Sequence, residues 1–127
     1  MRQSTFLKAI YLKSGPIPPD MCKKGTMRGL LMLQNKFTGE IPESYANCVT
    51  LQRFRVNNNS LTGTVPAGIW GLPNLNIIDI ELNQIEGPIT KDIGNVKDLA
   101  QLYAGNNQLS GELPEEFRKL HLLLLLI

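Results

Sequence analysis

Apolar residues recur along this chain of 127 residues at fixed places around four evenly spaced asparagines. The asparagines follow one another at intervals of 24 residues, and a glycine stands four residues after each of them. They are Asn35, Asn59, Asn83 and Asn107. Apolar residues occupy the positions eight, five and three before each asparagine and two after it. No single repeat can bury such a set alone, so we expect stacked copies to share one core.

The segment before each asparagine alternates apolar residues with other residues, which is the pattern of a strand with one buried face. It predicts short parallel strands at about residues 29–33, 53–57, 77–81 and 101–105. An asparagine amide both donates and accepts hydrogen bonds, so stacked copies can satisfy the backbone of a buried turn. The glycines allow a conformation or a close approach that a Cβ would obstruct.

A second short apolar-spaced stretch follows each glycine and predicts a 3₁₀ or α turn on the outer face. Pro42, Pro66 and Pro114 stand at the start of three of these turns, where a missing N–H costs least, and Thr90 replaces proline in the third repeat. A period of this length with these residues indicates an α/β leucine-rich-repeat solenoid of about four full repeats. Such a solenoid presents a surface for binding rather than a pocket for chemistry.

The repeat form LxxLxLxxNxLTGxIP closely resembles the plant-type leucine-rich repeat. Three stretches, PPDMCKKG at 18–25, GEIPESYANC at 39–48 and GIWGLPNL at 68–75, resemble ectodomains of HAESA/HAIKU-type receptor-like kinases. The resemblance covers about residues 15–117. It implies an extracellular solenoid followed, in the whole receptor, by one membrane-spanning helix and a cytoplasmic Ser/Thr kinase domain. It further implies a secreted peptide ligand and a co-receptor kinase as partners.

Only the first of those parts is expected here. No stretch of eighteen apolar residues, no glycine-rich phosphate loop and no H-R-D or D-F-G motif occurs, so we expect neither a membrane span nor kinase activity. Residues 1–14 lack the pattern of a signal peptide and are assigned to a non-repeat flank. The solenoid is assigned to 15–121, and 122–127 to the truncated start of a fifth repeat. Neither end resembles a polar cap, so a fragment of a longer receptor is expected.

The intervening side chains of the strands face a concave surface, and they include Arg53, Arg55, Asp79 and Tyr103. Two arginines separated by one residue make a fork of donors suited to a carboxylate. We therefore expect Arg53 and Arg55 to hold the carboxyl terminus of an extended peptide. Receptors of the similar subfamily use an Arg-x-Arg pair in this column for that purpose. The alternative is that both arginines pair with Asp79 and Glu81 along the sheet, where exposed pairs contribute about 0–1 kcal/mol.

Cys22 and Cys48 are one solenoid turn plus two residues apart, which allows either a disulfide on neighbouring coils or two buried thiols. Asn58-Asn59-Ser60 makes Asn58 a candidate glycan acceptor at the concave rim if the chain is secreted. Two cysteines without a histidine cluster predict no metal site, and no cofactor is expected. Thirteen basic and eleven acidic residues give no indication of nucleic-acid binding.

Three functional hypotheses follow from the sequence. The first is a ligand-recognition segment of a peptide-hormone receptor. The second is a soluble protein of the polygalacturonase-inhibitor kind that blocks another protein, although the Trp-Gly-Leu-Pro run and the Arg-x-Arg column favour the receptor. The third is a truncated product without activity. A full-length transcript distinguishes the three.

Overall fold

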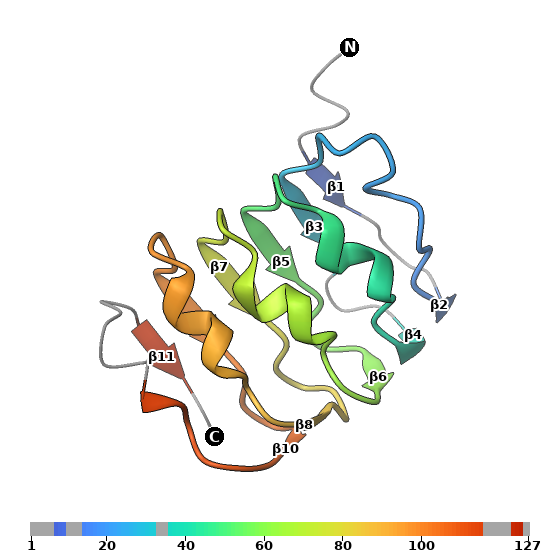
Figure 1. The fold of residues 1–127 in the computed structure, drawn as a ribbon. Coiled ribbons are helices and arrows are strands. Elements are labelled where there is room, and N and C mark those ends of the chain that lie inside the picture. Colours follow the sequence, from blue (N-terminus) through green and yellow to red (C-terminus); the bar gives the residue numbers. More distant parts are fainter. Residues whose placement is uncertain (1–6, 10–13, 33–35, 116–122, 126–127) are drawn as a thin grey trace.

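The computed structural model describes residues 7–9, 14–32, 36–115 and 123–125. One parallel sheet runs through the chain in the order β1-β3-β5-β7-β9-β11, so that every coil contributes one strand (Figure 1). Its strands are β1 (Leu7–Ala9), β3 (Gly29–Leu31), β5 (Arg53–Arg55), β7 (Ile77–Asp79), β9 (Gln101–Tyr103) and β11 (Leu123–Leu125). The predicted strands are present, and each is three residues long rather than five.

Hydrogen bonds extend the parallel register beyond the ends of these strands. The N–H of Val56 donates to the carbonyl of Asp79, and the N–H of Asn58 donates to the carbonyl of Glu81. The next two coils repeat these bonds, since the N–H groups of Ile80 and Leu82 donate to the carbonyls of Tyr103 and Gly105. Successive coils therefore lie in phase over the whole predicted strand length, even where the strand assignment stops.

In the part of the chain with described helix bounds, three 3₁₀ helices lie on the outer side of the solenoid, stacked one beside the next (Figure 1). They are η1 (Glu43–Asn47), η2 (Ala67–Gly71) and η3 (Lys91–Asn95). Pro42, Pro66 and Thr90 stand immediately before them in extended or near-extended backbone. The described residues contain no α-helix, so of the two predicted kinds of outer turn, 3₁₀ and α, the structure has the 3₁₀ kind.

A second set of short strands lies between the asparagine turns and the 3₁₀ helices, and it was not predicted. β2 (Ser14–Pro16), β4 (Lys36–Glu40) and β6 (Ser60–Thr62) form a parallel sheet, and β8 (Glu86–Gly87) pairs with β10 (Gln108–Leu109). A bridge between Thr64 and Glu86 links the two sheets. These strands have only two to five residues, which is too short to show a period of their own in the sequence.

The core consists of the apolar columns of the repeat, stacked coil on coil. Phe54, Ile78 and Leu102 share one column and are fully buried, as are Tyr45, Ile69 and Ile93 on the outer side. Trp70 of η2 is also completely buried. Because each coil contacts mainly its neighbours, the stack behaves as a one-dimensional array whose stability resides in the interfaces between coils.

The asparagines join each coil to the one before it. Asn83 donates through Nδ2 to the carbonyls of Val56, Ile80 and Glu81, and its Oδ1 accepts the N–H of Leu61 at 3.1 Å. Asn59 and Asn107 make the same four bonds one repeat earlier and one repeat later. Asn35 lies outside the described residues.

Left-handed backbone recurs at two columns. The glycines four residues after the asparagines have φ between 72° and 87°. The residue directly before each described asparagine is also left-handed, and it is Asn58, Leu82 or Asn106. Asparagine tolerates this conformation, whereas leucine does not. Leu82 has φ 60° and is 45% exposed, so it has neither a favoured backbone conformation nor a buried side chain.

The sheet extends across both boundaries assigned from the sequence. β1, which lies within the flank 1–14, pairs in register with β3, and Leu7 is opposite Gly29. β11, within 122–127, pairs with β9, and Leu123 is opposite Gln101. The flank therefore supplies one strand to the concave sheet.

Replacing Asn83 with alanine should lower the free energy of unfolding by about 3 kcal/mol, because it leaves several buried backbone groups without partners. Urea denaturation monitored by circular dichroism measures the loss. Asn74→Ala is the matched control, since Asn74 is exposed and makes one hydrogen bond, to the carbonyl of Val49. Equal effects of the two substitutions would contradict the structural role of the column.

Replacing Leu82 with asparagine should raise the free energy of unfolding by about 0.5–1 kcal/mol, because it restores the residue type that tolerates left-handed backbone. Leu113→Asn is the control, since Leu113 is similarly exposed, at 47%, and is not left-handed. A gain at both positions, or at neither, would show that the backbone of Leu82 is not the cause.

Candidate functional site

Strand β5 carries the two arginines on the concave face of the solenoid. Phe54 between them is fully buried, so strand alternation directs Arg53 and Arg55 away from the core. Arg53 is opposite Ile77, and Arg55 is opposite Asp79. The register therefore defines two rows across the sheet. The first row is Gly29, Arg53, Ile77 and Gln101, and the second row is Leu31, Arg55, Asp79 and Tyr103.

Arg55 and Asp79 form an ion pair in the second row. Arg55 Nη2 lies 3.2 Å from Asp79 Oδ2, and the side chain of Asp79 is only 3% exposed against 36% for Arg55. Burial raises the pKa of the Asp79 carboxyl above its ordinary value of 3.8, while the hydrogen bond from Arg55, that from the Glu81 backbone and the charge of Arg55 act to lower it. Arg55 thus has one of its donors committed to a buried acid.

Arg53 differs from Arg55 because it is exposed and has no such partner. Among the described residues, no hydrogen bond or ion pair is formed by its side chain, although Gln101 and Ile77 share its row. The alternative in which both arginines pair with Asp79 and Glu81 therefore holds for Arg55 alone. The guanidinium of Arg53 retains all its donors for a molecule in the groove.

Tyr103 lies in the second row, on β9, opposite Asp79 on one side and Leu125 on the other. Its hydroxyl donates to Oε1 of Gln101 at 3.2 Å, and both side chains are half-buried. The pair places an aromatic ring and an amide two strands from the arginines. Arg53, Arg55, Asp79 and Tyr103, which the sequence analysis selected, therefore share one face of one sheet.

Cys22 and Cys48 are joined by a disulfide with a Cα–Cα distance of 5.9 Å. The bond ties the loop before β3 to the end of η1, and side chains of η1 strengthen the attachment. The Tyr45 hydroxyl donates to the carbonyl of Pro18, and Ser44 donates to that of Pro19. Burial raises the pKa of Tyr45 to about 12. This loop is on the outer side, so the disulfide supports the scaffold rather than the concave site.

Asn58 is exposed and lies three residues after the end of β5, at the rim of the concave face. Its neighbours in the sequon have different surroundings, because Asn59 is bonded to backbone carbonyls and Ser60 begins β6. Asn58, which is the acceptor position of this sequon, therefore has an accessible side chain. A glycan there stays a prediction.

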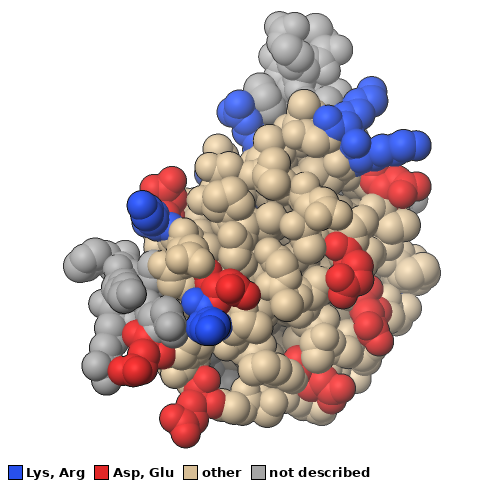
Figure 2. Space-filling view, in the orientation of Figure 1, with Lys and Arg blue, Asp and Glu red and all other residues tan. Residues whose placement is uncertain are grey.

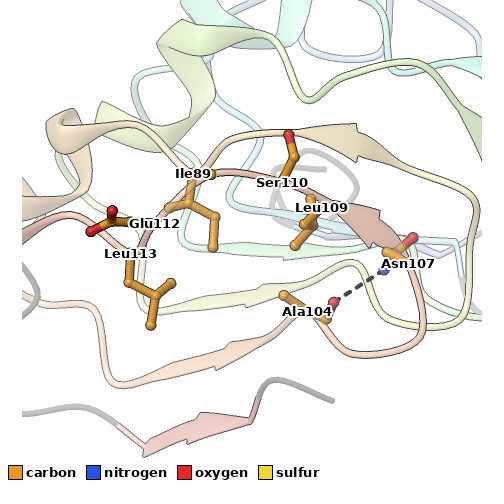
Figure 3. A pocket seen from close by; sticks show the side chains of 8 residues that line it. Ile89, Ala104, Asn107, Leu109, Ser110, Glu112 and Leu113 are labelled. Atoms are coloured by element: carbon orange, nitrogen blue, oxygen red, sulfur yellow. Dashed lines mark hydrogen bonds between the residues drawn. The ribbon is translucent and has the colours of Figure 1, made fainter.

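A cavity of about 280 Å³ lies at the C-terminal end of the described repeats, far along the stack from β5 (Figure 3). Its lining includes Ala104, Asn107 and Leu113, and these residues belong to columns that pack coil on coil earlier in the chain. Leu113 is 47% exposed, whereas Ile89 in the same column is 6% exposed. The cavity thus reflects the packing columns of the repeat and brings together no set of catalytic groups.

The charges on the outer face are unevenly distributed. Figure 2 shows basic side chains at the N-terminal end of this face and acidic ones along the edge that carries β4 and β6. Within the described ranges no three histidine, cysteine or acidic side chains are arranged to hold a metal ion. No helix in the part of the chain that the structure describes could cross a membrane.

Comparison with known proteins agrees with the fold. The leucine-rich-repeat family model matches residues 50–72 and 98–120. A search among curated proteins gave no significant match.

Solved structures give a closer comparison. The Arabidopsis receptor kinase HAESA ectodomain, in complex with an extended IDA peptide hormone, is 35% identical with a TM-score of 0.88, covering 91% of this chain and 20% of that one. The structure of HAESA with IDA and the co-receptor SERK1 is 37% identical with a TM-score of 0.82, and the match covers 86% of this chain and 18% of that one. The plant peptide hormone receptor RGFR1 in complex with RGF2 is 35% identical with a TM-score of 0.85, and the match covers 94% of this chain and 20% of that one.

The chain therefore has the leucine-rich-repeat fold of plant receptor ectodomains, with parallel strands inside and 3₁₀ turns outside. This confirms the fold class predicted from the repeat. The chain spans about a fifth of the length of the HAESA and RGFR1 chains that it matches.

The raised pKa of Asp79 predicts an unusual dependence of stability on pH. The folded chain holds the Asp79 proton at pH values where the unfolded chain has lost it, so the contribution of this residue is greatest below pH 3.8 and declines as the pH rises through the folded pKa. The unfolding free energy of the parent minus that of Asp79→Asn should therefore fall with rising pH from about pH 3.8. Urea denaturation across that range measures it, with Asp98→Asn as an exposed control. If this difference rises with pH instead, the interactions with Arg55 lower the pKa of Asp79 by more than burial raises it.

Proposed function

We propose that this leucine-rich-repeat chain is a ligand-recognition segment of a plant receptor-kinase ectodomain of the HAESA type. In this proposal a secreted peptide lies on the concave sheet, and its carboxyl terminus is held by Arg53 with help from Arg55. The chain acts outside the cell by binding, and the kinase that transmits the signal belongs to a part of the receptor that these 127 residues do not encode.

The observation that carries the proposal is the unpaired guanidinium of Arg53 on an ordered sheet. Phe54 is fully buried in the core, so the backbone of β5 is fixed and both arginines start from defined positions. Arg55 is held further by Asp79 at 3.2 Å. A carboxylate between the two arginines would gain charge-assisted hydrogen bonds from donors that are already oriented, which reduces the entropy lost on binding.

The rows of the concave sheet suit an extended ligand. A small molecule usually requires a concave pocket that buries most of its surface. A peptide instead gains contacts along several strands, and the rows defined by the register supply them on β3, β5, β7 and β9. Tyr103 and Gln101 are the further contacts proposed in these rows.

The related complexes support the same class of ligand. HAESA binds the IDA hormone and the co-receptor SERK1, and RGFR1 binds RGF2. We extend both partner classes, a secreted peptide and a co-receptor kinase, to this chain as part of the proposal. A glycan on Asn58 is compatible with it, because Asn58 is exposed and lies three residues after Arg55, the last residue of β5.

The clamp predicts that affinity depends on the free carboxylate of the ligand. IDA and RGF2 are the first probes, each with a free and an amidated carboxyl terminus, measured by calorimetry with this chain. Amidation of a bound peptide should weaken binding about 10- to 100-fold, the equivalent of about 1.5–3 kcal/mol for a charged hydrogen bond. Arg53→Gln should give a similar loss with the free peptide and almost none with the amidated one.

The substitutions must separate binding from stability. Arg55→Gln alone leaves Asp79 buried without its partner, so the double variant Arg55→Gln with Asp79→Asn is the proper test of Arg55. Lys97→Gln is the control, since Lys97 is exposed and lies on the outer side after η3. If the free and amidated peptides bind equally well, or if Arg53→Gln weakens both alike, the carboxylate clamp is wrong.

A further inference from the structure

The concave sheet carries a second uncompensated charge besides that of Arg53. Arg55 and Asp79 neutralise each other, so the remaining charges on β5, β7 and their extensions are Arg53 and Glu81. The side chain of Glu81 is half-buried, and among the described residues it makes no ion pair. The bond from the N–H of Asn58 to the carbonyl of Glu81 continues the parallel register, so Glu81 follows Asp79 on the same face.

Arg53 and Glu81 are too far apart to pair with each other. Arg53 is opposite Ile77, and Glu81 is four residues further along the chain. At a rise of about 3.3 Å per residue and a strand spacing of about 4.8 Å, their Cα atoms are roughly 14 Å apart. Arg53 and Glu81 therefore lie on adjacent coils, separated along the strand direction, and neither charge neutralises the other.

An unpaired acceptor accompanies Glu81. Asn57 lies beside Glu81 when the register of Arg55 with Asp79 is continued by two residues. Among the described residues its Oδ1 is buried without a hydrogen-bond partner, as is Nε of Arg55 two residues earlier. Buried acceptors of this kind are rarely left unpaired. A carboxylate and an amide oxygen without donors together suit a cationic group, which supplies two or more N–H donors.

We propose that Glu81 and Asn57 form a subsite for a basic side chain of the peptide ligand, a lysine or an arginine. This inference rests on the proposed function, because it takes the ligand carboxylate to be at Arg53. An extended peptide advances about 3.3–3.4 Å per residue, so a separation of roughly 14 Å corresponds to about four residues. The basic residue therefore lies three to five positions before the carboxyl terminus of the ligand. Arg55 helps to hold the carboxylate, and because it is paired with Asp79 it adds no net charge between Arg53 and Glu81.

The test uses pooled synthetic decapeptides with randomised sequences, one pool with free carboxyl termini and one amidated. Each pool is incubated with the immobilised chain, and the retained peptides are sequenced by mass spectrometry. The parent chain should retain the free pool preferentially, with lysine and arginine enriched at least threefold three to five residues before the terminus. Glu81→Gln should abolish that enrichment and keep the preference for free carboxyl termini. Glu81→Lys should replace it with enrichment of aspartate and glutamate at the same positions.

Glu86→Gln is the matched control, because Glu86 is an exposed glutamate on β8 rather than on the concave sheet. It should leave both preferences unchanged. The subsite is refuted if the basic enrichment is absent from the parent, or if it survives in Glu81→Gln while the carboxylate preference is intact. Loss of the carboxylate preference in the parent itself refutes the proposed clamp instead, so the two failures are told apart. Retention of no peptide at all refutes both.

Discussion

The asparagine at the end of each strand is the contact on which the rest of the structure depends. Its amide donates to a carbonyl of the preceding coil and accepts an N–H from that same coil, so one side chain fixes both the spacing and the phase of two coils. A buried turn without such a side chain would leave its backbone groups unpaired. Since Asn59, Asn83 and Asn107 all make the same bonds, a change in the phase of one of these coils would disturb the next.

This phase determines what the concave face can display. Strand alternation alone places Arg53 and Arg55 on one face of one strand, but only the register between coils brings Arg55 opposite Asp79 and Arg53 opposite Ile77. The arginines consequently differ, since one is half-buried in an ion pair and the other is exposed. The chemical asymmetry of the site is thus a product of stacking, and it would be lost if β7 slipped by two residues along β5.

The repeat made the fold predictable, because the columns of leucine, asparagine and glycine each have a physical role that recurs four times. The concave residues were predictable for the same reason, since they are the residues between the buried ones. The sequence did not reveal that Asp79 is buried, because its exposure depends on side-chain packing between coils rather than on strand alternation. Nor did it reveal the strands such as β6, or the left-handed backbone of Leu82, since leucine ordinarily signals a core position rather than a strained turn.

Stability and recognition are assigned to alternate residues of the same strand. Phe54 is fully buried and contributes to the core, while Arg53 on one side of it is free to contact a ligand. A solenoid built in this way can change its ligand by changing exposed residues without altering the columns that hold the coils together. The fold therefore does not specify a ligand, and the assignment must rest on the few charges that the scaffold leaves unpaired. Of the two arginines on β5, Arg53 is the one that the scaffold leaves available, and so the identity of the ligand depends chiefly on what can satisfy it.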